Sequence, residues 1–334
     1  MSYGLAASGI KIIGGIDVDN TCRTTYESNV SGAEFIETDV SAVKPAQLLR
    51  KIGIKRCDDQ LVVVGCSPCQ FWSKINTDKT RSRQTAFLLH EFGKFIAASR
   101  PGWVIIENVP GILSKKGSAL PDFLELLKSL KYNHSHALVD MSKFGIPQTR
   151  HRFVLIATRL PITPALPDAT QNCKKTVRDC LGVENGFLRI EAGHMDESAF
   201  LHTASGLSEL NLARIRATPK DGGTRSAWAS DPVLSVPAYE NRPNQFADVY
   251  SRMSWDRPSP TITTRFNSYS NGRFGHPEED RAISLREGAT LQTFPRHFKF
   301  FGSVPTIAKH IGNAVPPAFA RRLGKQILKQ HSSI

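Results

Sequence analysis

The chain has 334 residues, and its 43 lysines and arginines against 30 aspartates and glutamates give a formal charge of +13 and a pI near 9.6. A chain of this length can bury a sizeable core in about two domains. The excess of positive charge favours a polyanionic partner such as nucleic acid, although a ribosome-associated or anionic-lipid-binding protein could carry the same charge. The absence of a signal-peptide pattern, of a membrane-spanning apolar run and of a dense cysteine framework indicates a cytoplasmic protein rather than a membrane or disulfide-rich secreted one.

The predicted elements alternate between strands and helices up to about residue 158. Strands are expected at 10–16, 61–65, 103–108 and 153–157, and helices at 21–29, 45–52, 84–99 and 121–130. This alternation predicts an α/β domain with a Rossmann-like, doubly wound and mainly parallel sheet. The following sequence is rich in proline, glycine and polar residues, with one helix expected at 207–216, so we expect a smaller irregular domain there. The last helix, at 316–329, is expected to return to the first domain.

The strand predicted at 61–65 is followed by a cysteine motif, Cys66-Ser67-Pro68-Cys69-Gln70. Ligands collect beyond the carboxyl ends of parallel strands, so Cys69 is a candidate nucleophile. An inert buried cysteine, a redox pair and half of a zinc site are alternatives. The zinc alternative is weak, because no second Cys-x-x-Cys follows and the histidines stand at no zinc-finger spacing.

Three later segments also carry candidate functional groups. The apolar strand 103–108 contains Glu107, and a carboxylate there is costly unless it is paired or employed. Gln148, Arg150 and Arg152 alternate along an extended chain and so share one face, which suits an anionic or carbonyl-rich ligand. A solvated basic edge strand is the alternative. The Gly-Asn-Ala-Val-Pro-Pro run at 312–317 marks a helix boundary.

These motifs, taken together and in this order, resemble the DNA cytosine-5 methyltransferase family of the bacterial restriction-modification type. The segments 257–264 and 280–287 support the resemblance, which covers nearly the whole chain except a less patterned stretch at about 161–248. It implies a catalytic and cofactor-binding domain at 1–158, a target-recognition region at 159–285 and a C-terminal segment at 286–334 that returns to the catalytic domain.

One departure from the family pattern lies at the start of the chain. The family opens with a strand and a loop of the type Phe-x-Gly-x-Gly-Gly, whereas residues 1–5 resemble the helix that follows that loop. The expectation is that the usual first strand and its loop, which approaches the cofactor, are missing. A functional start upstream of Met1 and a decayed copy are the two explanations, and the intact later motifs favour the first.

The resemblance also implies a mechanism. The Cys69 thiolate would add to C6 of a flipped cytosine so that C5 accepts the methyl group of S-adenosylmethionine. Glu107 would hold the N3/N4 edge, which needs a raised pKa, and Arg152 would bind the O2 side. Arg150 would support the nucleophile loop and a nearby phosphate.

Further residues are assigned from the resemblance, and no metal is expected. The cofactor would be held by Asp17 and Val18, by Asp39 and Val40, and more weakly by Pro68, Ala86, Asn313 and Ala314. DNA contacts are expected from Gln70, Ser73 and Gln148. Basic, flexible loops also make Arg225 and Arg265 candidate DNA contacts, with a solvated loop as the alternative for each. His310 stands where many relatives have glutamine, which is a second departure.

The implied function is site-specific methylation of cytosine in double-stranded DNA by a monomer in the cytoplasm. A cognate restriction endonuclease acting separately is a candidate partner. A tRNA cytosine-5 methyltransferase and a truncated, non-catalytic nucleic-acid-binding relic are the alternatives.

Overall fold

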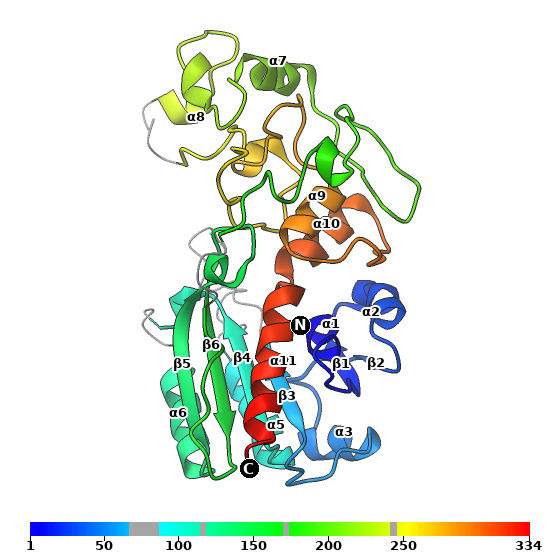
Figure 1. Ribbon diagram of the computed structural model, residues 1–334, viewed down its shortest axis with the longest axis vertical. Helices are drawn as coiled ribbons and strands as arrows, with labels where there is room; N and C mark the ends of the chain where they lie inside the picture. The colour runs from blue at the N-terminus through cyan, green and yellow to red at the C-terminus, as the bar shows by residue number, and fades with distance from the viewer. Residues whose placement is uncertain (67–86, 114–117, 170–173, 241–245) are drawn as a thin grey trace.

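The computed structural model describes residues 1–66, 87–113, 118–169, 174–240 and 246–334. The strands of this part of the chain lie in the lower half of Figure 1, where long helices cover them. The upper half consists of loops and short helices. The two halves match the expected division into a regular α/β domain and a smaller irregular one.

The lower half is formed mainly by the first 158 residues. Its elements are α1 (Ser2–Ala6), β1 (Gly14–Asp17), η1 (Asn20–Cys22), α2 (Arg23–Asn29), β2 (Glu34–Glu37), α3 (Pro45–Lys51), β3 (Val62–Gly65), α5 (Leu88–Ser99), β4 (Trp103–Asn108), η3 (Pro110–Ile112), α6 (Leu120–Ser129), β5 (Asn133–Asp140), η4 (Met141–Phe144) and β6 (His151–Thr158). The later elements are η5 (Val183–Asn185), α7 (Glu209–Ala217), η6 (Arg225–Trp228), α8 (Pro237–Glu240), η7 (Tyr269–Asn271), α9 (Leu285–Leu291), α10 (Val304–Asn313) and α11 (Pro317–His331).

Every predicted strand and helix has a counterpart among these elements, although the strand expected at 10–16 is shorter and lies at 14–17. The sequence patterns did not predict β2, β5, α9 or α10. In β2 a glutamate stands at each end of only four residues, and β5 is polar and largely exposed. Neither strand therefore shows the apolar run that marks a buried strand.

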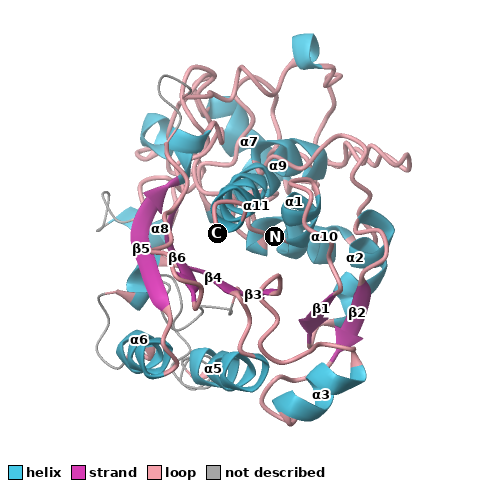
Figure 2. Ribbon diagram, turned by 60° about the horizontal axis from the view of Figure 1, so that its bottom comes forward, coloured by secondary structure: helices cyan, strands magenta, loops and turns pink. Residues whose placement is uncertain are grey.

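The strands form two sheets that lie edge to edge in Figure 2. In one sheet β1 pairs with β2 in parallel; in the other the order is β3-β4-β6-β5, with β3 and β4 parallel. Strand β6 runs antiparallel to both of its neighbours, so it is no solvated edge strand. Among the described residues, β1 and β3 each have a strand partner on one side only. The Rossmann-like α/β prediction is confirmed.

Helices cover both faces of the larger sheet, as Figure 2 shows. Side chains of β4 alternate between the faces: Trp103 and Ile105 pack in one core with α1 and α11, whereas Val104 and Ile106 pack in another with α5 and α6. Strand β6 alternates in the same way. A strand buried on both faces reads as a continuous apolar run, and this explains the sequence pattern of β4.

A third core belongs to the upper half of the molecule. It contains Val177, Leu181 and Phe187 together with residues of α9 and α10, among them Leu285, Ile307 and Ile311. Helix α11, in contrast, packs through Phe319 and Leu323 on the sheet. The chain therefore passes from the third core to the larger sheet at about Pro317.

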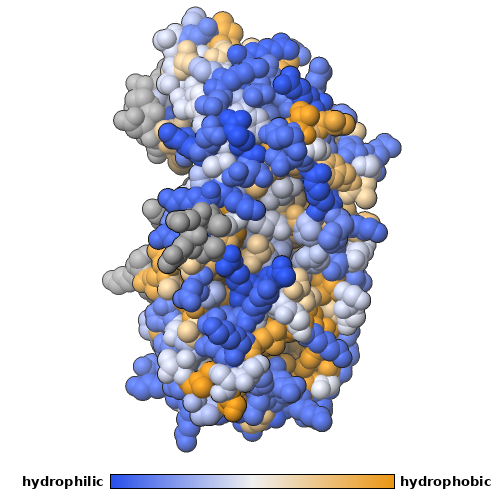
Figure 3. Space-filling view, in the orientation of Figure 1, coloured by the Kyte–Doolittle hydropathy of each residue, from blue (hydrophilic) through white to orange (hydrophobic). Residues whose placement is uncertain are grey.

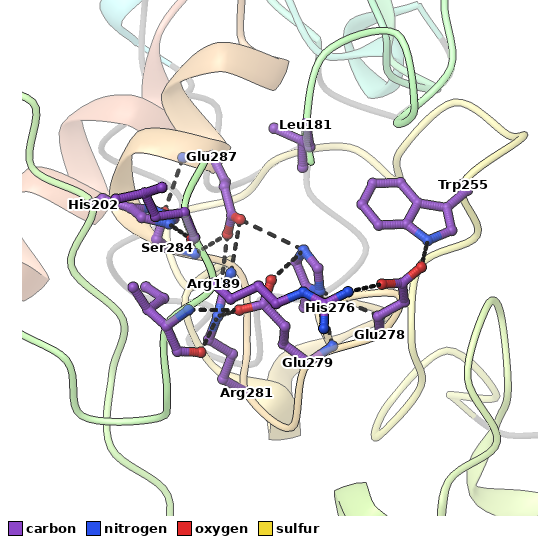
Figure 4. Close-up of polar contacts among 12 residues, drawn as sticks. Leu181, Arg189, His202, Trp255, His276, Glu278, Glu279, Arg281, Ser284 and Glu287 are labelled. Carbon is purple, nitrogen blue, oxygen red and sulfur yellow. Dashed lines mark hydrogen bonds and ion pairs between the residues drawn. The ribbon is translucent and has the colours of Figure 1, made fainter. Parts of the chain in front are cut away.

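A buried ion-pair network holds this upper core, and Figure 4 shows its geometry. Arg281 donates from Nη1 and Nη2 to the two carboxylate oxygens of Glu287, at 2.7 and 2.9 Å. Glu287 also completes a capping box with Ser284 at the start of α9. Burial alone would raise the pKa of Glu287, but the Arg281 guanidinium outweighs it and holds that pKa below its ordinary value. Burial lowers the pKa of the adjacent His276 to about 4, so this imidazole is neutral at pH 7.

Replacing Glu287 by glutamine should destabilise the protein strongly. The Glu287→Gln variant keeps the shape of the side chain but leaves the buried Arg281 charge without its main partner, at a cost of about 3–5 kcal/mol in the free energy of unfolding. The exposed pair Arg178–Asp256 supplies a matched control, since Asp256→Asn should leave the unfolding midpoint unchanged. Equal urea-unfolding midpoints for Glu287→Gln and the wild type would contradict this interpretation.

Candidate functional site

Glu107 and Arg152 meet where β4 ends and β6 begins. Because the two strands are antiparallel, the carboxyl end of one lies beside the amino end of the other. The Arg152 Nε lies 3.1 Å from the Glu107 Oε1, and the side chains are only 15% and 10% exposed. A carboxylate and a guanidinium therefore stand side by side in a largely dry position, where electrostatic interactions are stronger than in water.

The Met1 α-amino group interacts electrostatically with Glu107. The α-amino group of Met1 is buried, which lowers its pKa, while its interactions with Cys66 and Glu107 oppose that shift. Cys66 directly follows β3 and precedes the proposed nucleophile loop.

Gln148 and Arg150 form a buried polar hub with Gln292. The Gln148 Nε2 donates to the Gln292 Oε1 at 2.7 Å and to the Leu291 carbonyl at 3.1 Å, and its Oε1 accepts from the Ile262 amide at 3.3 Å. Gln292 in turn donates to the Ile311 and Ala314 carbonyls. Sequence reasoning missed Gln292, because no motif or periodicity marks a single glutamine after a short helix.

Arg150 connects the same segments through its guanidinium. Nη1 donates to the Ile262 carbonyl at 3.2 Å and Nη2 to the Ala314 carbonyl at 3.1 Å, while the buried Nε has no hydrogen-bond partner among the described residues. Burial lowers the pKa of Arg150 to about 9, and it stays cationic at neutral pH. The hub therefore joins the Gln148–Arg152 stretch to the 257–264 segment and to the α10–α11 junction.

A glycine permits the close approach of these segments. A Cβ on Gly312 would lie 2.3 Å from the Thr263 carbonyl carbon and 2.4 Å from the Thr264 nitrogen, so a larger residue would push the two backbones apart. Asn313 follows at the exposed end of α10, and the half-buried Ala314 supplies the carbonyl that Arg150 and Gln292 bind. Motifs about 160 residues apart thus meet at one place.

Two expected DNA contacts need correction. Gln148 is fully buried in the hub, because its amide serves the protein backbone on both sides. Arg225 is only 7% exposed: its guanidinium stacks 4.0 Å from the centre of the Tyr239 ring and donates to the Phe246 carbonyl. Neither side chain presents itself to a ligand at the surface. Arg265, in contrast, is exposed, three residues after the Ile262 carbonyl that Arg150 binds.

The expected cofactor residues lie at the carboxyl ends of the smaller sheet. Asp17 ends β1 and is exposed, Val18 is 68% exposed, and the Asp17 carbonyl accepts from the Thr38 amide just beyond β2. Asp39 is exposed, and hydrogen bonds from Ser41 lower its pKa; Val40 beside it is half-buried. The exposed carboxylates of Asp17 and Asp39 can accept hydrogen bonds from the hydroxyls and the amine of a nucleoside, and the exposed Val18 can contact the apolar face of its base.

The loop after β1 is tied to α10. The Asp17 carboxylate accepts from the Asp19 amide at 2.9 Å, and the Asp19 carboxylate accepts from the Lys309 ammonium at 2.6 Å. This hydrogen bond lowers the pKa of Asp19 to about 2. Burial raises the pKa of the nearby Cys22 thiol to about 11 and lowers that of His310.

Several predicted site residues lie outside the described residues: Pro68, Cys69, Gln70, Ser73 and Ala86. The structure does describe the end of β3 that leads to them and the Glu107–Arg152 pair on the neighbouring strands. Within the described part of the chain, no helix is long and apolar enough to cross a membrane.

Comparisons with known proteins agree with one another. Residues 1–329 match the family described as C-5 cytosine-specific DNA methylase. The chain shares 37% identity over 333 residues with the Type II methylase M.HgiDII of Herpetosiphon aurantiacus, which covers 98% of this chain and 91% of that protein. It shares 25% identity over 343 residues with the Type II methyltransferase M1.HphI of Haemophilus parahaemolyticus, over 99% and 84% of the two chains.

A solved structure shows the same fold. A crystal structure of an E. coli prophage protein, described as a DNA modification methyltransferase, matches with a TM-score of 0.73 at 20% identity, over 98% of this chain and 95% of that one. At this identity the likeness establishes the arrangement of the chain and no more.

The positions of Gln148 and Arg265 predict opposite effects of substitution. Gln148→Leu should leave the buried Gln292 Oε1 and the Ile262 amide without a partner, which costs about 1–3 kcal/mol of stability for each. Arg265→Ala should leave thermal unfolding unchanged. If the Arg265 side chain contacts a phosphate, the slope of the logarithm of the DNA-binding constant against the logarithm of the salt concentration should become shallower by about one. Thermal unfolding and fluorescence-anisotropy titrations of a DNA duplex at several salt concentrations measure both effects. A Gln148→Leu variant with wild-type stability would contradict the hub.

Proposed function

Because the chain belongs to the C-5 cytosine-specific DNA methylase family, we propose that it methylates C5 of a flipped cytosine at a specific DNA site, through a covalent adduct of Cys69. The chain is an S-adenosylmethionine-dependent DNA cytosine-5 methyltransferase of the restriction-modification type. The observation that carries the proposed pocket is the Glu107–Arg152 pair at the ends of β4 and β6.

The proposed role of the smaller sheet is to hold the cofactor. S-adenosylmethionine supplies, when bound, an electrophilic methyl group. Asp17 would accept hydrogen bonds from ribose hydroxyls, Asp39 would accept one from the adenine amine, and Val18 and Val40 would contact the ring. Asn313 ends α10 and Ala314 caps it, and both keep their proposed cofactor contacts. Pro68 and Ala86 keep their proposed cofactor contacts.

Cys69 would carry the covalent step. Its thiolate forms a bond to C6 of cytosine, which makes C5 nucleophilic. Transfer of the methyl group to C5 would break its bond to the sulfonium sulfur and leave a neutral thioether. The C5 proton would then leave to solvent and the bond between the Cys69 sulfur and C6 would break, which restores the aromatic ring and the free cysteine. A target base is inaccessible in a stacked duplex, so it must swing out into the pocket.

Glu107 and Arg152 would recognise and polarise the flipped base. The carboxyl group faces the N3/N4 edge and shares a proton with N3 as negative charge develops, while the guanidinium donates to O2. Cytosine presents these groups on adjacent positions of one ring, and the structure brings the two side chains within 3.1 Å of each other.

Arg150 would act as a positioning residue. Its two Nη groups are occupied by the Ile262 and Ala314 carbonyls, which leaves the buried Nε as the donor for a carbonyl of the nucleophile loop. The burial of Arg150 disfavours the phosphate contact that the resemblance implied.

DNA would bind where the two halves of the molecule meet. The outline in Figure 3 is notched between them, and Arg265 is exposed close to the hub that joins them. Gln70 and Ser73 flank the nucleophile and would lie on the DNA side. The charge of +13 favours phosphate neutralisation. We further propose that the enzyme acts as a monomer in the cytoplasm and that a cognate endonuclease cuts the unmethylated site.

The covalent step is tested with DNA in which 5-fluorocytosine replaces cytosine. Fluorine at C5 cannot leave as a proton does, so with S-adenosylmethionine the wild type should form an adduct that survives denaturing electrophoresis. A long amplified DNA is used as the substrate because it contains every short recognition sequence. Cys69→Ser should form no adduct, and Glu107→Gln should form it at least about 100-fold more slowly.

Cys57→Ser supplies the control, because Cys57 is exposed and precedes β3, whereas Cys69 follows the other end of that strand. It should form the adduct at the wild-type rate. An adduct in Cys69→Ser, or a wild-type rate in Glu107→Gln, would refute the assigned roles.

A further inference from the structure

Three side chains of different chemistry meet between the loop after β1 and helix α10. Asp19, Cys22 and His310 each offer one ligand atom, and these atoms lie within 4.8 Å of one another. They form the one such group found in residues 1–66, 87–113, 118–169, 174–240 and 246–334. Asp19 and Cys22 are close in sequence, whereas His310 arrives from a helix 288 residues further along the chain.

The geometry of this cluster is close to that of a metal site. Tetrahedral zinc, with bonds of about 2.0–2.3 Å, places its ligand atoms roughly 3.3–3.8 Å apart. The His310 Nε2 lies 3.9 Å from the Asp19 Oδ2, so small side-chain movements would bring the atoms to that spacing. The His310 side chain is only 10% exposed, and its Nε2 lies 3.0 Å from the Thr21 hydroxyl, a contact that a cation bound at Nε2 would replace. Cys22 forms no disulfide.

The donor set selects one class of cation. A thiolate, an imidazole nitrogen and a carboxylate oxygen together suit zinc and related transition metals, whereas magnesium and calcium prefer oxygen ligands alone. We propose that Asp19, Cys22 and His310 bind a zinc-class divalent cation, with water in the fourth position. On binding, the thiol proton leaves to solvent and the Lys309 ammonium moves away from Asp19.

The place of the cluster gives the site a consequence. The Asp19 amide donates to the Asp17 carboxylate, so a cation at Asp19 would fix the loop that carries the proposed cofactor acid against α10. Methyl transfer itself needs no metal in this scheme, and the cation site stands independently of the proposed function.

Cobalt titration of the purified, metal-free full chain tests the site. Co²⁺ replaces zinc in such sites and gives a near-ultraviolet band when a thiolate binds it. The wild type should bind one equivalent with this band, Cys22→Ser should lose the band, and His310→Gln should bind at least about 10-fold more weakly. Lys309→Gln should bind more tightly than the wild type, because it removes the competing ammonium.

Two further cysteine variants make the result specific. Cys180→Ser should keep the wild-type band, because Cys180 is also half-buried but lies in the upper core. Cys69→Ser should keep it as well. A band that persists in Cys22→Ser, a band lost in Cys69→Ser alone, or no cobalt binding by the wild type would overturn the proposal.

Discussion

The ion pair between Glu107 and Arg152 is the constraint on which the α/β half of the molecule depends. A carboxylate that is 10% exposed at the end of a buried strand is stable only with a partner, and the partner must arrive at the same sheet edge. An antiparallel β6 meets this need, because its first residues lie beside the last residues of β4. The antiparallel strand β6 thus places a guanidinium beside a carboxylate where the flipped cytosine is proposed to bind.

The hub of Gln148, Arg150 and Gln292 extends this arrangement to the rest of the chain. These side chains hydrogen-bond to one another and to backbone groups of distant segments. They therefore hold the Gln148–Arg152 stretch, the 257–264 segment and the α10–α11 junction together. The upper core has its own buried pair in Arg281 and Glu287. Polar contacts, which are directional, therefore hold the 257–264 segment and the α10–α11 junction against the residues that lead into β6, in addition to apolar packing.

Sequence patterns predicted the fold wherever burial on both faces produced apolar runs, as in β4, or a helical stripe, as in α6. They failed for the polar strand β5 and for α9 and α10, whose apolar residues are shared with loops of the upper core. Glu107 and Arg152, which the family resemblance assigned to one cytosine ring, do lie side by side. Gln148 and Arg225, which are expected to contact DNA, are instead buried and hydrogen-bond to other parts of the protein that only the tertiary structure brings close.

The most direct test of the account is mass spectrometry of nucleosides from nucleic acid incubated with the purified chain and S-adenosylmethionine. Duplex DNA and tRNA are treated in parallel and then digested to nucleosides. The account predicts 5-methyldeoxycytidine from the DNA, none from DNA treated with Cys69→Ser, and unmodified tRNA. Methylated cytidine from the tRNA alone, or methylation of the DNA at N4 instead of C5, would contradict it.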